Sequence, residues 1–245
     1  MNTNKKEYIE FKYVISDTLF LPMNEQLQES YLLFQNGINA SLEKIIRQEE
    51  KKIIQWLIHN ENFKYLLFEH LELHSEPFIS LETIEPIFSN ISEGEIDIII
   101  IPKDSSTNTI SIECKRIVEK IGNDGELIFN RKYIEKISSQ ANRNFDLGFN
   151  KNYVCFIIEV DCREPLETNV LFQSSSDNTL KTVANFPGRD KLKNEIGIII
   201  VEIVQLTNKS FKNTSKISLG ILKQSTEQEQ PKELTKKINI LLNNK

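Results

Sequence analysis

Apolar residues follow two different periods along this chain. Over residues 38–59 they recur every three to four positions, which predicts an amphipathic helix. A second, shorter helix is expected over residues 63–73. After Pro77 the pattern changes to short, dense apolar runs bounded by turn-forming residues, and such runs predict buried strands. The sequence therefore predicts an α/β fold whose helices come first.

The strand-like runs are interrupted by one clear helix. This helix is expected over residues 130–145 and should end near Gly148, and a short terminal helix is expected over 234–242. Residues 161–194 are expected to form loops. The expected strands cover residues 77–88 (one strand or a bent pair), 95–101, 109–116, 153–160, 197–205 and 217–222. The middle of the chain then runs helix, strand, strand, strand, helix, strand, an order shared by many α/β proteins.

The composition indicates the class of protein and the cellular compartment. The 245 residues, 39% of them hydrophobic and 27% charged, are typical of a soluble globular protein. No apolar run approaches the roughly 20 residues needed to cross a bilayer, and the first residues do not form a secretory signal, so we expect no membrane association. Three cysteines without framework spacing favour a reducing, cytoplasmic setting. We expect an N-terminal segment (1–37), an α/β domain (38–222), and a polar linker with a C-terminal helix (223–245).

The net charge of −5 limits the kind of nucleic-acid partner that the chain can have. A protein that coats DNA would be basic overall, and this chain is not. An enzyme needs only a local basic path and can bring metal ions to the phosphate. The charge therefore disfavours tight metal-free DNA binding and leaves nuclease chemistry open.

Two neighbouring strands carry the residues that point to chemistry. Asp97 lies in an Ile-rich run that follows Gly94, and Glu113, Cys114 and Lys115 close the next run. Side chains alternate along a strand, so Glu113 and Lys115 share one face while Cys114 points to the core. If the strands pair as a hairpin, Asp97 lies beside Glu113, and two carboxylates with one ammonium suit a magnesium ion and an activated water. The alternative is an exposed sheet edge that carries a cross-strand ion pair.

At these residues the chain resembles the PD-(D/E)xK nuclease superfamily, over roughly residues 75–160. Asp97 matches the first acidic position, and Glu113-Cys114-Lys115 matches (D/E)-x-K, although the usual proline before the first acid is absent. The resemblance implies a restriction-endonuclease-like core (α-β-β-β-α-β, a mixed sheet flanked by helices), here with N-terminal helices and a C-terminal helical tail. It also implies an endonuclease, a DNA-binding hydrolase that cleaves phosphodiester bonds with Mg²⁺, for which Mn²⁺ can substitute.

The resemblance also assigns roles to individual residues. Asp97, one oxygen of Glu113 and the backbone carbonyl of Cys114 would bind the metal, and Lys115 would orient the attacking water. Family members often carry a further acid on the helix before the sheet. Glu49 is the candidate because it lies within the apolar stripe of its helix, although it could equally extend from the stripe edge into solvent. Glu43 and Glu50 flank that stripe and are expected to be exposed.

The helix after the motif offers a last candidate. Its polar stripe consists of Lys132, Lys136, Gln140 and Arg143. In related nucleases a Gln or basic residue on this helix reaches the active site or the scissile phosphate, and Gln140 is the best match, followed by Lys136. The alternative is that this stripe is simply a solvated helix face.

By analogy, the composition and small size fit a prokaryotic restriction or phage-defence (antiviral) nuclease. DNA is the expected partner. Target recognition or activation would come from a homo-oligomer, from a partner subunit or from residues 161–220. Two other functions stay open: a binding or interaction module that kept the fold and lost the chemistry, and a nuclease that acts on RNA.

Overall fold

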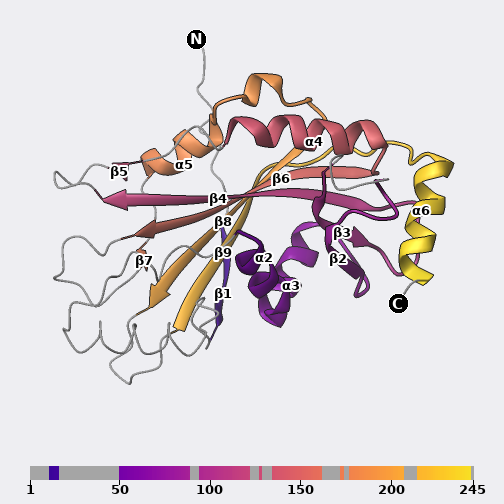
Figure 1. Cartoon of the computed structure of the whole chain (residues 1–245). Helices are drawn as coiled ribbons and strands as arrows, with labels where there is room; N and C mark the ends of the chain where they lie inside the picture. The colour runs from indigo at the N-terminus through magenta and orange to yellow at the C-terminus, as the bar shows by residue number, and fades with distance from the viewer. Residues whose placement is uncertain are drawn as a thin grey trace, which may run out of the picture.

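One mixed β-sheet forms the centre of the protein (Figure 1). In the computed structural model the described residues are 11–16, 50–88, 94–121, 127–128, 134–161, 172–173, 177–206 and 214–243. The strands are β1 (Lys12–Ser16), β2 (Phe78–Thr83), β3 (Ile96–Ile101), β4 (Ile110–Ile121), β5 (Leu127–Ile128), β6 (Lys151–Asp161), β7 (Phe172–Gln173), β8 (Gly197–Leu206) and β9 (Thr214–Lys223). They are ordered β1-β9-β8-β6-β4-β3-β2, while short β5 pairs with β4 and short β7 pairs with β6.

The strand directions divide the sheet into two parts. β2, β3 and β4 form an antiparallel meander, whereas β4, β6 and β8 are parallel to one another. β9 and β1 complete the sheet with antiparallel pairings. Parallel strands are buried on both faces, which explains why β6 and β8 read in the sequence as continuous apolar runs. The expected α/β class is therefore confirmed.

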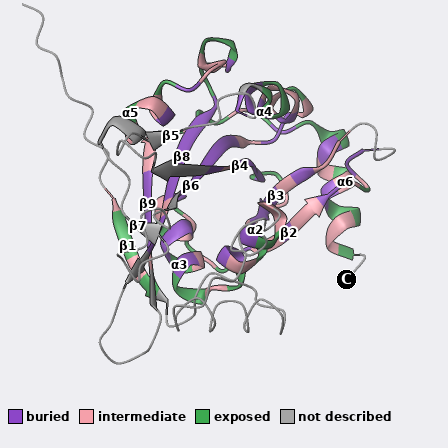
Figure 2. Ribbon diagram, turned by 60° about the vertical axis from the view of Figure 1, so that its left-hand side comes forward, coloured by how far each residue is buried: buried purple, intermediate pink, exposed green. Residues whose placement is uncertain are grey.

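Helices cover both faces of the sheet (Figure 1). α2 (Glu50–His59) and α3 (Glu61–His70) pack on one face, α4 (Glu135–Leu147) and α5 (Asp177–Ala184) on the other, and α6 (Lys232–Asn243) lies beside β3. β4 contributes to the core on both faces of the sheet, because Ile112 packs with α2 and α3 while Ile117 packs with α4. Burial is greatest in the middle strands, as Figure 2 shows for β6 and β8.

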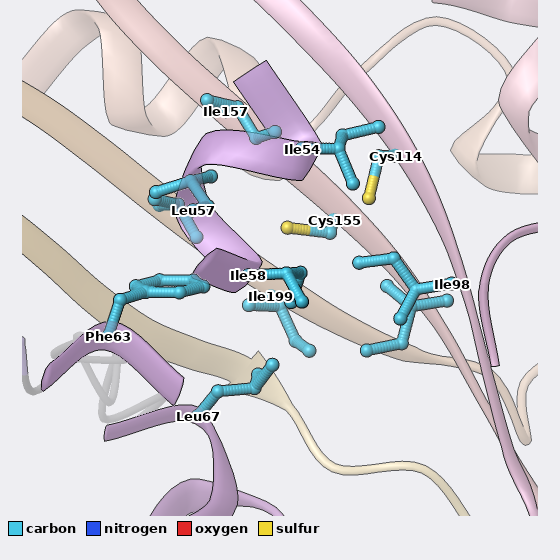
Figure 3. Close-up of a pocket in the computed structure, with 12 residues that line it drawn as sticks. Ile54, Leu57, Ile58, Phe63, Leu67, Ile98, Cys114, Cys155, Ile157 and Ile199 are labelled. Atoms are coloured by element: carbon cyan, nitrogen blue, oxygen red, sulfur yellow. The ribbon is translucent and has the colours of Figure 1, made fainter. Parts of the chain in front are cut away.

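The two cysteines of the described chain belong to this core. Cys114 in β4 and Cys155 in β6 are register neighbours, and both are buried free thiols. Together with Ile54 and Leu57 of α2 they line a small apolar cavity between the helices and the sheet (Figure 3). The Cys114 side chain thus points into the core, as strand alternation predicted.

The C-terminal residues pack against the sheet-bearing part of the chain. The Gln228 side chain donates hydrogen bonds to the carbonyl oxygens of Phe145 and Phe149, at 2.9 Å each. The Gln230 side chain donates to the Ser106 carbonyl at 2.8 Å and accepts from Thr109, the residue that precedes β4. The segment expected as a polar linker therefore holds the ends of α4 and β4 while α6 packs beside β3.

Several boundaries differ from those expected. Residues 161–194, expected to be loops, include β7, α5 and a 3-10 turn over Arg189–Lys191. β4 continues past the expected end at residue 116 to Ile121, because β6 pairs with it as far as Lys120 and β5 pairs with its last two residues. α4 ends as expected at Gly148, whose φ of 90° is left-handed. Of the expected segment 1–37 the structure describes residues 11–16, where β1 pairs with β9. None of the described helices is long and apolar enough to span a membrane.

Candidate active site

The motif residues lie where β3 and β4 part. The ladder between these strands pairs Ile98 with Ile112 and continues to Ile100 and Ile110, so Asp97 and Glu113 lie immediately beyond its end. There the Cys114 backbone N–H donates to Asp97 Oδ2 at 2.7 Å. A side-chain carboxylate thus accepts from the β4 backbone, and the two strands form a fork with Asp97 and Glu113 at its base.

Glu113 is a carboxyl group held inside the protein, with an exposed fraction of 1%. Asn144 Nδ2 of α4 donates to its Oε1 at 2.6 Å, and Arg143 Nη2 lies 3.5 Å from the same oxygen. Burial raises the pKa of Glu113 to about 8, and the negative charge of Asp97 contributes in the same direction. Asn144 and Arg143 act against this shift because both stabilise the ionised form.

Asp97 is the second carboxyl group at the fork, and its surroundings shift its pKa in both directions. Burial raises the pKa of Asp97 to about 6, and the hydrogen bond from the Cys114 N–H acts in the opposite direction. The charges of Glu50 and Glu95 raise this pKa further, while that of Lys115 lowers it. Two carboxylates at one buried place repel each other, so the fork favours a bound proton or a bound cation between them.

Lys115 is anchored from the other side of the fork. Its Nζ lies 3.1 Å from Glu50 Oε1, at the start of α2. Glu50 Oε2 accepts the backbone N–H of Arg116 at 2.7 Å, so one carboxylate binds both the side chain of Lys115 and the backbone of β4. The ammonium group is half-buried. Glu50 therefore limits the positions that Lys115 can take beside Asp97.

Further ion pairs surround this centre. Lys51 Nζ lies 3.0 Å from Glu95 and 3.4 Å from Glu82, and these carboxylates raise its pKa. On β4 and β6, Arg116 Nη2 donates to the buried carboxylate of Glu159 at 2.6 Å. These contacts connect α2 with β2 and with the residue that precedes β3, and they connect β4 with β6. The catalytic candidates thus lie in a polar region that several elements hold in place.

The structure changes the choice of supporting residues. Glu50, expected to be exposed, instead contacts Lys115 and β4, which corrects that expectation. Glu49, the expected acid, lies outside the described residues. On α4 the Gln140 side chain is exposed, and Asn144, one turn later, is the residue that contacts Glu113. Asn144 is four positions beyond Gln140, so helical spacing places it on the same face, but only the fold shows that it contacts Glu113.

Asp97, Glu113 and the Cys114 backbone supply oxygen atoms of the kind that Mg²⁺ prefers. The part of the chain that the structure describes contains no group of three or more His, Cys, Asp or Glu side chains that could hold a metal ion. A site with two carboxylates and a main-chain carbonyl is a smaller set, in which water would fill the other positions. The donor chemistry at the fork therefore fits a hard divalent cation.

Comparison with known proteins adds no assignment of family. The sequence matches no protein-family model, and no curated protein matches it.

Proposed function

We propose that this protein is a metal-dependent nuclease with a restriction-endonuclease-like core, in which Asp97, Glu113 and Lys115 are the central residues. One observation carries the proposal: the acids of the expected motif meet where β3 and β4 part, and Lys115 lies close enough to lower the pKa of Asp97. A cross-strand ion pair on an exposed edge would not explain a glutamate with an exposed fraction of 1%.

The order of elements supports the same proposal. α2 and α3 precede the antiparallel strands β2, β3 and β4, after which α4 leads to β6, parallel to β4. The resemblance predicted this order of helix, three strands, helix and strand. The helices before and after the three strands pack on opposite faces of the sheet, so both can contribute side chains to the fork.

The cation proposed for this site is Mg²⁺ or Mn²⁺, held by Asp97, Glu113 and the Cys114 carbonyl. When bound, such an ion neutralises charge on the phosphate and makes a coordinated water more acidic. The geometry supports this set, because Asn144 and the Cys114 N–H orient the two acids and Glu113 is buried at the end of the β3–β4 ladder.

The chain's own residues then have distinct tasks. Lys115, positioned by Glu50, would orient the water that attacks the phosphorus and assist the loss of its proton. Asn144 would hold Glu113 in a fixed rotamer, since its amide donates to one carboxylate oxygen and leaves the other available. The Cys114 N–H orients Asp97 in the same manner.

A cleavage assay tests the proposal. Supercoiled plasmid DNA and single-stranded RNA would each be incubated with the protein in Mg²⁺, in Mn²⁺ or in EDTA. Asp97→Ala and Lys115→Ala should lower metal-dependent cleavage by roughly 10²–10⁴-fold. The control is Asp104→Ala, which removes an exposed carboxylate from the loop between β3 and β4 and should cleave like the wild type.

The substrate comparison separates the remaining functions. Cutting of plasmid supports the DNA nuclease, and cutting of RNA alone would assign the same site to RNA. If the folded wild type cuts neither substrate, alone or with its genomic neighbours, the nuclease proposal fails and an inactive binding module takes its place. The expected role in restriction or phage defence, and the expected oligomer or partner subunit, stay predictions.

A further inference from the structure

The Arg143 guanidinium occupies a socket formed by the segment that leads into β3. Its Nη2 donates to the Glu95 carbonyl at 2.8 Å, and its Cζ lies 4.7 Å from the centre of the Phe88 ring. Gly94 forms another wall, because a Cβ added there would lie 2.0 Å from Nη1. The φ of Gly94 is +106°, which also disfavours any other residue. The hydrogen bond to the Glu95 carbonyl, the Phe88 ring and the space left by Gly94 thus fix the position of the Arg143 guanidinium.

The same guanidinium reaches one of the proposed metal ligands. Nη2 lies 3.5 Å from Glu113 Oε1, and Asn144, the next residue of α4, donates to that oxygen. Glu95 is separated from Asp97 by one residue, and Gly94 by two. Arg143 therefore contacts the carboxylate on β4 and also the backbone just before the carboxylate on β3.

The fork needs such a connection because its two acids lie beyond the β3–β4 ladder. The ladder ends at Ile98 and Ile112, and β4 beyond this point pairs with β6. A contact that spans the open end of the fork can set the distance between Asp97 and Glu113. Arg143 has the required reach and number of donors, since its planar head can bind a carbonyl and a carboxylate at once.

We propose that Arg143 is a positioning residue for the metal-binding pair: seated against Gly94, Phe88 and the Glu95 carbonyl, it fixes Asp97 and Glu113 at the spacing that a divalent cation needs. The inference rests on the proposed function in one respect, that these two acids bind the cation. It assigns Arg143 no contact with the phosphate and no proton transfer.

The test measures Mn²⁺ binding to the full chain without DNA, by isothermal titration calorimetry. Arg143→Gln should raise the Kd for Mn²⁺ by roughly 10–100-fold, the usual effect of removing a group that orients a metal ligand. Gly94→Ala should weaken binding in the same direction, because a methyl group displaces the guanidinium while its charge remains. Arg143→Lys should restore part of the affinity. Lys236→Gln, which removes an exposed positive charge on α6, should bind within about twofold of the wild type.

A double variant tests whether the effects of Gly94 and Arg143 on the Kd for Mn²⁺ have one common cause. If Gly94 acts through Arg143, the Kd of Gly94→Ala/Arg143→Gln should rise by clearly less than the product of the two single effects, whereas the full product would show two unrelated defects. Circular dichroism and thermal melting would confirm that each variant is folded. If Arg143→Gln does not fold, the Kd values of the conservative Arg143→Lys and of Gly94→Ala can still be compared with that of the wild type. With cleavage as a second readout, the Mn²⁺ concentration for half-maximal rate should rise while the rate at saturating Mn²⁺ changes little.

The outcomes separate this inference from the nuclease proposal. If the wild type binds Mn²⁺ but cuts no nucleic acid, the nuclease proposal fails, and a raised Kd in Arg143→Gln still supports the positioning role. Folded Arg143 variants with the wild-type Kd would overturn the positioning role while cleavage by the wild type stands. A wild type that binds no Mn²⁺ overturns both.

Discussion

Replacement of Glu113 by glutamine should stabilise the folded protein while abolishing the proposed activity. The carboxyl group has an exposed fraction of 1%, and its pKa is raised from 4.5 to about 8 by burial and by the charge of Asp97. Glutamine has nearly the same shape, and its carbonyl oxygen can still accept from Asn144. The substitution therefore removes an ionisable group that the folded state disfavours.

The size and pH dependence of this gain follow from the shifted pKa. Because the pKa of Glu113 is higher in the folded state, that state keeps a proton that the unfolded chain releases, so stability falls as pH rises from about 4.5 to about 8. One pKa unit corresponds to about 1.4 kcal/mol, which gives Glu113→Gln an advantage of about 1 kcal/mol at pH 5 and about 3 kcal/mol at pH 7. Above pH 8 the advantage approaches about 5 kcal/mol, part of which belongs to the pair with Asp97.

Urea unfolding at pH 5, 7 and 9 in EDTA would measure this difference. The single tryptophan, Trp56 of α2, packs against the core and provides a fluorescence signal. Glu76→Gln, an exposed carboxylate, is the control and should differ from the wild type by less than about 0.5 kcal/mol at each pH. A Glu113→Gln protein that is less stable than the wild type at pH 9, or an advantage that does not grow with pH, would contradict this prediction.

Three other predictions concern separate parts of the structure. Glu50→Gln should lower the cleavage rate by about one to two orders of magnitude, because Lys115 loses its ionic anchor, and single-turnover kinetics would show this at saturating metal. Mn²⁺ at about 100 times its Kd should stabilise the wild type by about 2.7 kcal/mol in urea unfolding, and Asp97→Asn should lose this effect. Gly148→Ala should cost about 1–3 kcal/mol by the same assay, since φ is +90° and the new Cβ would lie 2.3 Å from Pro231 Cδ; stability equal to the wild type would contradict this.

The strands of the fork were predictable because their sequence signals are local. The Ile-rich runs around Asp97 and before Glu113 predict strands whatever packs on them, and alternation places Glu113 opposite the buried Cys114. The loop between the runs contains several turn formers, which favours a hairpin and hence an Asp97–Glu113 pair. The structure has these features.

The supporting residues could not be predicted in the same way. Glu50 follows the apolar stripe of its helix, so its periodicity indicates exposure, yet the start of α2 lies over β4 and buries part of the side chain. Asn144 is one of many polar residues on α4, and only the crossover from β4 to β6 brings it to Glu113. α5 is short and polar, and its packing through Val183 depends on neighbours distant in sequence. Tertiary contacts decided all three.

The two sides of the fork differ in how firmly they are built. β4 pairs with β6 from Ile110 to Lys120, whereas β3 pairs with β4 only from Ile98 to Ile100. β2 pairs with the other edge of β3. Glu113 therefore lies in the strand with the longer ladder on this side of the site, and Asp97 lies beyond the end of the shorter β3–β4 ladder. A larger ion such as Ca²⁺ would be accommodated by outward displacement of Asp97, with Glu113 and Lys115 left in register. Tolerance for ions of different radius would then depend on how far β3, which β2 and the Arg143 contact at Glu95 hold, can move.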